Sequence, residues 1–181
     1  MTDDPEEWSD FPHYTVLPAN ASLDNINLNL AKLQASVARN TSTGSSNTTL
    51  DTQETLQNTR CIDGQLVGWG GILPLSWFPI RVTGDSCIPP STRQAGLYQT
   101  HCHVYLSVSI VYLWNRQRIS RVRAQTIILT QLSLQEPSPS NYTSQAACEH
   151  KIQQLADDIC ASIPFYLGDR TRSGKMGDRN V

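Results

Sequence analysis

The chain has 181 residues, of which 39% are hydrophobic and 17% are charged, and its formal net charge is −2. This length suits one domain, but the low apolar content predicts a packed core of only about 90–100 residues. The nearly balanced charge gives no electrostatic reason to expect nucleic-acid binding by the chain as a whole. The 5 cysteines are scattered and form no Cys-x-x-Cys pair, which argues against a disulfide framework and a structural zinc site.

The first residues, MTDDPEEW, are acidic and contain no apolar run, so they do not resemble a secretory signal. No stretch approaches the ~18 consecutive apolar residues that a membrane span requires. We therefore expect a protein without a membrane segment, located in the nucleus or, alternatively, in the cytoplasm.

Residues 1–22 contain three prolines and show no period, so we expect a disordered lead-in. Residues 23–39 are different, because apolar side chains recur there at steps of three and four. This spacing predicts an amphipathic helix with a narrow seam that suits docking on other helices, with Ser22 or Asp24 as N-cap. The seam consists of Leu23, Ile26, Leu30, Leu33 and Val37. Residues 40–51, rich in Asn, Ser and Thr, are expected to form a flexible linker.

Residues 52–167 are expected to form a helical domain. Its first helix begins near Thr52 and should end near Gly70, because several glycines weaken it there. In residues 72–79 (ILPLSWFP), two prolines bracket aromatic side chains. This segment predicts an ordered turn whose Trp77 and Phe78 pack on the core, followed by a loop over residues 81–96.

The longest helical candidate runs from Leu97 to Leu134. Its β-branched residues leave a strand over 103–113 as an alternative, but apolar character continues to Leu129 without a turn signal, which favours helix. After a break at residues 136–141, a last helix is expected over residues 144–163. Pro164 should stop this helix, because the residue before a proline is disfavoured in the helical region. Residues 168–181 are expected to form a disordered tail. The fold class is therefore all-α, with about four helices packed around a long central one.

The central helix carries unusual polar residues inside its apolar surroundings: Trp114, Asn115, Arg116, Arg118, Arg121 and Arg123. A basic nucleic-acid patch is one interpretation, but these arginines are spread around the helix rather than confined to one stripe. Buried Arg and Asn side chains need partners. We therefore expect Arg118 and Arg121 to be held inside the bundle, by carboxylates such as Asp157 or Asp158 or by backbone carbonyls.

No catalytic, cofactor or metal site is predicted. His101 and His103 would diverge on a helix and converge only on a strand or loop, and no further ligand lies nearby in sequence. Asp157 and Asp158 are neighbours that face different directions on a helix, so they do not form an acid/base pair. No phosphate-binding loop or nucleophile motif is recognisable.

Three blocks carry a family resemblance. Residues 61–78 (CIDGQLVGWGGILPLSWF) contain a helix that ends at Trp69, then a Leu-Pro turn and Trp77. Residues 112–121 (YLWNRQRISR) contain a Trp-Asn-x-x-Arg helix, and residues 156–168 (ADDICASIPFYLG) follow it. In this order and spacing the blocks resemble the regulatory region of fungal zinc-cluster transcription factors and related proteins encoded beside them.

The resemblance implies an all-α domain, a nuclear location and a role in fungal gene regulation. The six-cysteine zinc cluster that reads DNA in this family is absent, and the helices that usually follow the last block are absent too. We therefore expect a shortened relative that contacts a protein partner, such as another transcriptional regulator, and does not bind DNA directly. The exposed part of the Leu23–Val37 seam is one candidate contact surface. A marginally folded or non-functional fragment, and an accessory protein or enzyme of a biosynthetic gene cluster, remain the alternatives.

Overall fold

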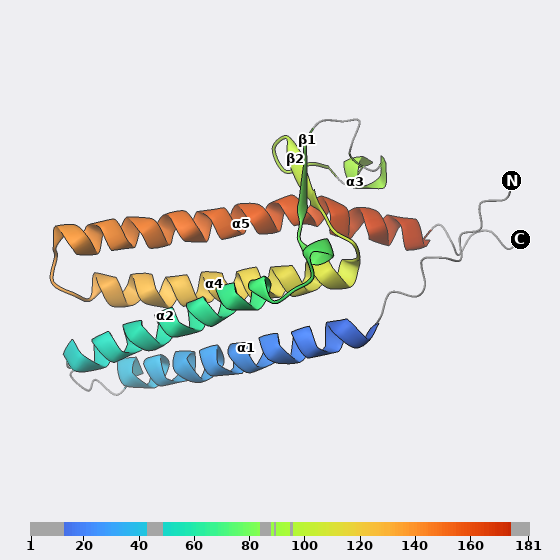
Figure 1. The fold of residues 1–181 in the computed structure, drawn as a ribbon. Coiled ribbons are helices and arrows are strands. Elements are labelled where there is room, and N and C mark those ends of the chain that lie inside the picture. The colour runs from blue at the N-terminus through green and yellow to red at the C-terminus, as the bar shows by residue number, and fades with distance from the viewer. Residues whose placement is uncertain (1–12, 43–48, 84–87, 89, 95, 175–181) are drawn as a thin grey trace, which may run out of the picture.

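The computed structural model describes residues 13–42, 49–83, 88, 90–94 and 96–174. Four long helices dominate this part of the chain: α1 (His13–Ser42), α2 (Thr49–Gly71), α4 (Val108–Ser133) and α5 (Pro139–Gly174). Figure 1 shows α4 in the middle, with α5 along one side and α1 and α2 along the other. Direct contacts of α4 with α5, α2 and α1 agree with this arrangement. The prediction of an all-α fold is confirmed.

A small β-hairpin lies against α5 and extends away from the other long helices (Figure 1). Strand β1 (Ile80–Thr83) pairs antiparallel with β2 (His101–Val104), so that Arg81 lies opposite His103. A short helix, α3 (Pro90–Gln94), lies between the two strands in the chain, and both β2 and α3 pack against α5. Side chains of the hairpin therefore lie next to those of α5.

The start of the central helix differs from the prediction. A helix beginning at Leu97 is wrong, because Gly96 and Gln99 adopt positive φ angles and the chain then extends into β2. The strand alternative is correct in kind but lies at residues 101–104 rather than 103–113. Ser107 then begins α4 as its N-cap, accepting a hydrogen bond from the backbone N–H of Ile110 at 3.4 Å.

The first helix begins earlier than predicted. Residues 13–22 belong to α1 with Pro18 inside it, so the disordered lead-in is wrong for these residues, and residues 1–12 lie outside the described part. Burial explains the extension, because Ala19 packs in the core and its carbonyl accepts a hydrogen bond from Trp69 Nε1 at 2.9 Å. The predicted linker is likewise wrong at its ends: 40–42 close α1 and 49–51 open α2, while 43–48 lie outside the described residues.

The last helix also extends beyond both predicted ends. Pro164 lies inside α5 and is buried, and the helix continues to Gly174. The prediction that Pro164 stops the helix is wrong, because Phe165 and Tyr166 pack against the core and outweigh the lost backbone hydrogen bond. The predicted tail is therefore helical over residues 168–174, and residues 175–181 lie outside the described part.

The main core joins α1, α2, α4 and the segment between α2 and β1. The α1 seam takes part in it, since Leu23 and Leu30 are buried and Ile26 and Leu33 pack against them. The seam therefore docks on other helices of the bundle, as the residue spacing predicts, and little of it is left exposed as a contact surface. Other members of the main core are Ile62, Leu66, Trp69, Leu73, Trp77, Tyr105, Ile110, Val111, Leu113 and Ala124.

Candidate functional site

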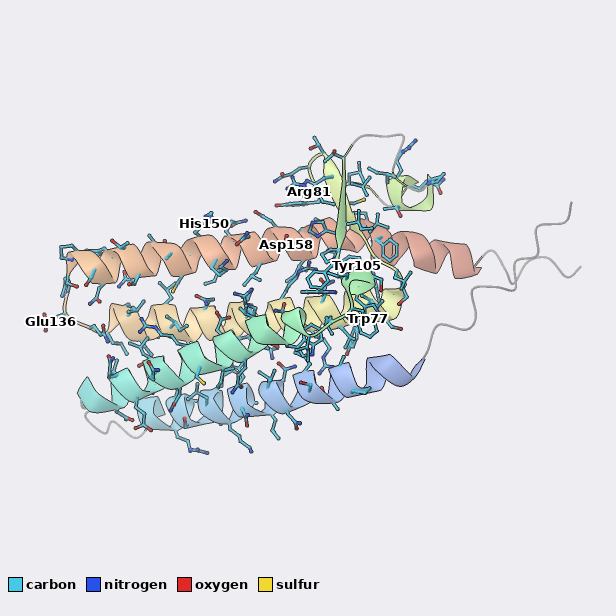
Figure 2. The ribbon with its side chains drawn as sticks, in the orientation of Figure 1. Trp77, Arg81, Tyr105, Glu136, His150 and Asp158 are labelled. Carbon is cyan, nitrogen blue, oxygen red and sulfur yellow. The ribbon has the colours of Figure 1, made fainter. Side chains whose placement is uncertain are left out.

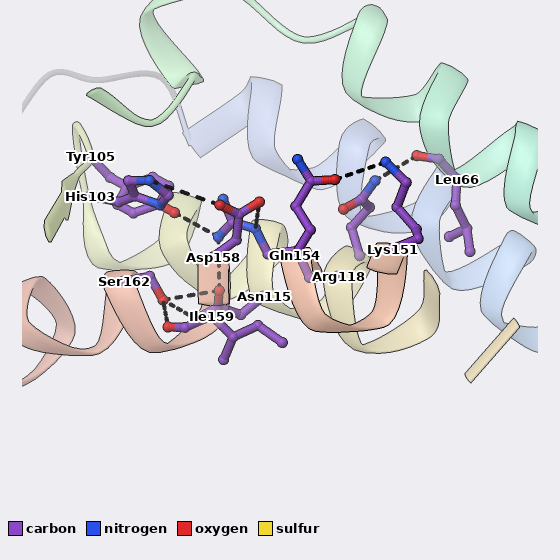
Figure 3. A network of polar contacts seen from close by, with 11 residues as sticks. Leu66, His103, Tyr105, Asn115, Arg118, Lys151, Gln154, Asp158, Ile159 and Ser162 are labelled. Atoms are coloured by element: carbon purple, nitrogen blue, oxygen red, sulfur yellow. Dashed lines mark hydrogen bonds and ion pairs between the residues drawn. The ribbon is translucent and has the colours of Figure 1, made fainter. Parts of the chain in front are cut away.

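Arg118 is the centre of a buried polar network between α4, α5 and the hairpin (Figure 3). Its Nη1 donates hydrogen bonds to Tyr105 Oη at 2.7 Å and to Asn115 Oδ1 at 3.0 Å. Its Nε lies 4.0 Å from Asp158 Oδ2, and its guanidinium carbon lies 5.7 Å from the centre of the Trp114 ring. The side chain is only 4% exposed, so these groups replace water around the charge.

Asn115 and Ser162 extend this network from α4 to α5. Asn115 Nδ2 donates to Ser162 Oγ at 2.8 Å, and Ser162 Oγ lies within hydrogen-bond distance of the Ile159 carbonyl at 2.7 Å. Ser162 is fully buried. Side chains of this kind are better satisfied in one register of the two helices than in any other, so the pair helps to fix how α4 packs on α5.

His103 approaches the same network from the hairpin (Figure 3). The side chain is buried, its Nε2 lies 4.0 Å from Asp158 Oδ1, and its Nδ1 has no hydrogen-bond partner among the described residues. Burial, and then the nearby Arg118 charge, lower the pKa of His103 below its usual value, although Asp158 opposes them. His103 is therefore held neutral near pH 7.

The other polar residues of α4 bind different partners from those expected. Arg121 Nε donates to Asp63 Oδ1 at 2.9 Å, not to Asp157 or Asp158, and Gln125 donates to the second Asp63 oxygen at 2.9 Å. Arg121 and Asp63 are both half-buried, which makes this a firm link between α4 and α2. Arg116 donates to Asn20 at 2.6 Å and pairs with Asp24, both on α1.

Asp157 faces the loop before β2 and not the central helix. It accepts hydrogen bonds from Tyr98 Oη at 2.7 Å and from Gln153 at 2.8 Å. These two hydrogen bonds lower the pKa of Asp157. The pKa of Tyr98 rises, mainly because its hydroxyl donates to this carboxylate. Asp157 and Asp158 therefore make separate contacts, and each of them links the hairpin region to α5.

The three core tryptophans connect the other elements. Trp69 and Trp114 form an edge-to-face pair with ring centres 5.7 Å apart. Trp114 Nε1 donates to the carbonyl of Trp77 at 2.8 Å, so the segment after α2 is tied to α4. Phe78 lies against Trp114, with ring centres 5.4 Å apart, but remains 37% exposed, so the expected packing of Phe78 is only partial.

The polar network is only partly enclosed. Arg118, His103 and Ser162 are buried, whereas Asn115 is half-buried and the Asp158 side chain is 40% exposed. His101 and His103 do come together on β2, with ring centres 6.0 Å apart, because this segment is a strand and not a helix. Within the described ranges, no group of three or more His, Cys, Asp or Glu side chains is placed to hold a metal ion. Burial raises the pKa of the neighbouring Cys102 thiol, which disfavours the reactive thiolate.

One exposed feature that the sequence does not predict runs from the segment after α2 to the first residue of β1. Four apolar side chains there point to solvent: Ile72 (70% exposed), Leu75 (89%), Phe78 (37%) and Ile80 (66%). We call these four residues the connection surface. Leu73 and Trp77 of the same segment are buried, so the segment is anchored to the core at two positions and exposes the side chains around them. In the sequence, Pro74 and Pro79 are the one signal of this exposed surface. They prevent a regular helix, which could bury one whole face of apolar side chains.

No family model, curated protein or solved structure matches this chain. Among the described helices, none is long and apolar enough to cross a membrane. The resemblance to fungal zinc-cluster regulators therefore stays a prediction from the three sequence blocks.

Proposed function

We propose that this protein is a helical interaction domain that takes part in gene regulation by binding a protein partner through the connection surface, without contacting DNA itself. The observation that carries the proposal is the exposure of four large apolar side chains within residues 72–80. Groups of exposed apolar residues commonly mark binding surfaces in soluble proteins. Burying one such side chain fully contributes about 1.5–3 kcal/mol, so this surface has apolar area to offer a partner.

The segment that carries the connection surface is held in place before any partner arrives. Trp77 is buried, and its carbonyl accepts the Trp114 hydrogen bond. Leu73 is buried on the other side of Pro74. A surface fixed in this way loses little conformational entropy on binding, which favours affinity.

The arginines of α4 support the exclusion of DNA from the proposal. Arg116, Arg118 and Arg121 are directed to partners on α1, α5 and α2 respectively, so they do not form a free basic stripe. The chain also carries a formal charge of −2, whereas phosphate binding requires accumulated positive charge. The regulatory role and the nuclear location rest on the resemblance of residues 61–78, 112–121 and 156–168 to the zinc-cluster regulators.

The test is proximity labelling from the full-length chain in a fungal nucleus, comparing wild type with Leu75→Asp. Leu75 is 89% exposed, so the charge should block apolar docking without unfolding the chain. The matched control is Leu134→Asp, since Leu134 is 61% exposed at the far end of α4. We expect a transcriptional regulator to be labelled by wild type and by Leu134→Asp and to be lost with Leu75→Asp. Equal labelling by all three proteins would contradict the proposed surface.

A further inference from the structure

Strand β1 has an open edge on the side away from β2. Within the described part of the chain the sheet has two strands, and β1 pairs with β2 alone. Strand β2 packs against α5, whereas β1 packs mainly against β2. Ile80, Arg81 and Thr83 are exposed, and Val82 is half-buried. An open strand edge of this kind is a template on which another extended chain can form backbone hydrogen bonds.

The backbone groups at this open edge belong to Arg81 and Thr83. His101 of β2 pairs with Thr83 on one side and forms a bridge with Tyr98 on the other. Its backbone N–H donates to the Tyr98 carbonyl at 3.2 Å, which is the side away from β1. In an antiparallel pair the N–H and C=O of one residue point to the same side, and that side alternates along the strand. Thr83, opposite His101, and Arg81, two residues earlier, therefore direct their N–H and C=O groups away from β2.

The side chains of β1 form one apolar face and one polar face, because successive side chains of a strand point to opposite faces. Ile80 and Val82 lie on the first face. Arg81 and Thr83 lie on the second, where Arg81 is exposed and forms no ion pair among the described residues (Figure 2). A strand added beside β1 would place its alternate side chains next to these two faces. The segment that matches β1 therefore alternates apolar residues with residues that carry carboxylates.

We propose that the protein partner adds an extended segment to the open edge of β1, and that this segment alternates apolar and acidic residues. The inference rests on the proposed function for the existence of a partner, and it specifies how that partner is recognised. Ile80 belongs to both the connection surface and β1, so a strand added to β1 lies next to that surface. A second copy of this chain matches less well, because it would bring a second Arg81 to the same edge instead of a carboxylate.

Amide-resolved NMR of the full-length chain tests the inference, with a synthetic peptide of alternating valine and glutamate as the probe. In the free chain, the amides of Arg81 and Thr83 should exchange with solvent faster than the amide of Val82, which points to β2. Adding the peptide should protect the Arg81 and Thr83 amides from exchange, because they then donate to the added strand. A peptide of alternating valine and lysine is the control, and it should bind more weakly by about tenfold.

Two variants separate the contribution of charge from that of the backbone. Arg81→Glu should reverse the preference, so that the lysine peptide binds about tenfold more tightly than the glutamate peptide. The matched control is Arg123→Glu, which changes the net charge equally at an exposed position of α4 and should keep the wild-type preference. Thr83→Pro removes an outward-facing N–H and leaves the pairing with β2 in place, so it should weaken binding of both peptides.

The opposing results are distinct. The inference is overturned if the glutamate peptide does not bind, if it binds without protecting Arg81 and Thr83, or if Arg81→Glu or Thr83→Pro leaves its affinity unchanged. Protection of these two amides that rises with protein concentration, without any peptide, would overturn it in favour of a second copy.

The proposed function can fail or stand separately. If Leu75→Asp abolishes partner labelling while Arg81→Glu and Thr83→Pro leave it intact, the strand-addition inference fails and the proposed function stands. If the glutamate peptide binds as expected while Leu75→Asp leaves partner labelling unchanged, the proposed function fails and the edge of β1 stands as a binding site for extended acidic segments.

Discussion

At the residue scale, several polar side chains of α4 are buried and bind partners inside the bundle. Arg118 is held by Tyr105, Asn115 and Asp158, and Gln117 donates to the Leu66 carbonyl of α2 at 2.9 Å. Each of these groups would lose several kcal/mol of hydration if it were buried without a partner, roughly 2–7 kcal/mol for an uncompensated polar group. Their pairing therefore specifies which faces of the helices meet.

Stability should depend on pH through His103. Its folded-state pKa lies below its unfolded value, mainly because the imidazole is buried, so the unfolded chain binds more protons as pH falls below about 6.5. The free energy of unfolding should therefore increase as pH rises from about 5 to 7. Groups facing His103 are His101, Arg81, Arg118 and Asp158.

Urea unfolding of wild type and His103→Gln at several pH values measures this effect. The variant should lose a large part of the pH dependence in that window, because Gln cannot be protonated. Asp157 contributes at lower pH, because its pKa is lower in the folded chain than in the unfolded chain. Its contribution to the free energy of unfolding is fully present above the unfolded pKa and is lost as pH falls through the folded pKa. His150→Gln, on the exposed part of α5, is the control and should keep the wild-type pH dependence. An unchanged pH dependence in His103→Gln would show that His103 is not the titrating group.

The sequence predicts that these arginines need partners, but it does not identify them. Asp157 and Asp158 are plausible from sequence because they lie on the next helix, and Asp158 does approach Arg118. Arg121 instead pairs with Asp63, 58 residues earlier in the chain. The pairing depends on how α2 is rotated about its axis relative to α4. The spacing of residues within either helix does not indicate that rotation.

At the scale of the elements, a close contact between α2 and α4 explains one of the glycines. A Cβ atom added to Gly70 would lie 3.1 Å from Trp114 Cη2, whereas one added to Gly64 meets nothing within 4 Å. The Trp114 ring is held by its hydrogen bond to Trp77 and by its contacts with Trp69 and Phe78, so it has little room to move.

Because of this contact, replacing glycine by alanine should have opposite effects on the free energy of unfolding at Gly64 and at Gly70. Gly64→Ala should raise the free energy of unfolding by about 0.5–1 kcal/mol, because alanine favours helix and nothing obstructs it. Gly70→Ala should lower it, because the added methyl presses on a fixed ring. Chemical denaturation of both variants measures the difference. Equal stabilisation by both would mean that the Trp114 ring yields.

Helix periodicity predicts the middle of each long helix well and its ends poorly. The α1 seam and the stop of α2 near Gly70 follow from residue spacing and glycine content. The continuation of α5 through Pro164 depends instead on Phe165 and Tyr166 packing on the core. The strand β2 forms because His101–Val104 pairs with β1, a contact across about 20 residues that local spacing does not encode.

At the scale of the whole molecule, contacts between side chains link the four long helices and the hairpin to one another. Arg118 joins α4 to α5 and to the hairpin region, and the tryptophans join α1, α2 and α4. Far-UV circular dichroism and tryptophan fluorescence should therefore report one coincident thermal transition. Two separate transitions, or a gradual loss of signal, would favour the alternative of a marginally folded fragment.

We conclude that α4 is the structural centre of the molecule and that Arg116, Arg118 and Arg121 hold the bundle together. The most direct measurement is the free energy of unfolding of Arg118→Ala beside Arg123→Ala in urea. Arg118 is 4% exposed and its loss leaves Asp158 and Tyr105 without their cation, whereas Arg123 is exposed on the same helix. We predict a loss of about 3 kcal/mol for Arg118→Ala and less than about 0.5 kcal/mol for Arg123→Ala. An equally small change in both variants would contradict the claim and return the arginines of α4 to a surface role.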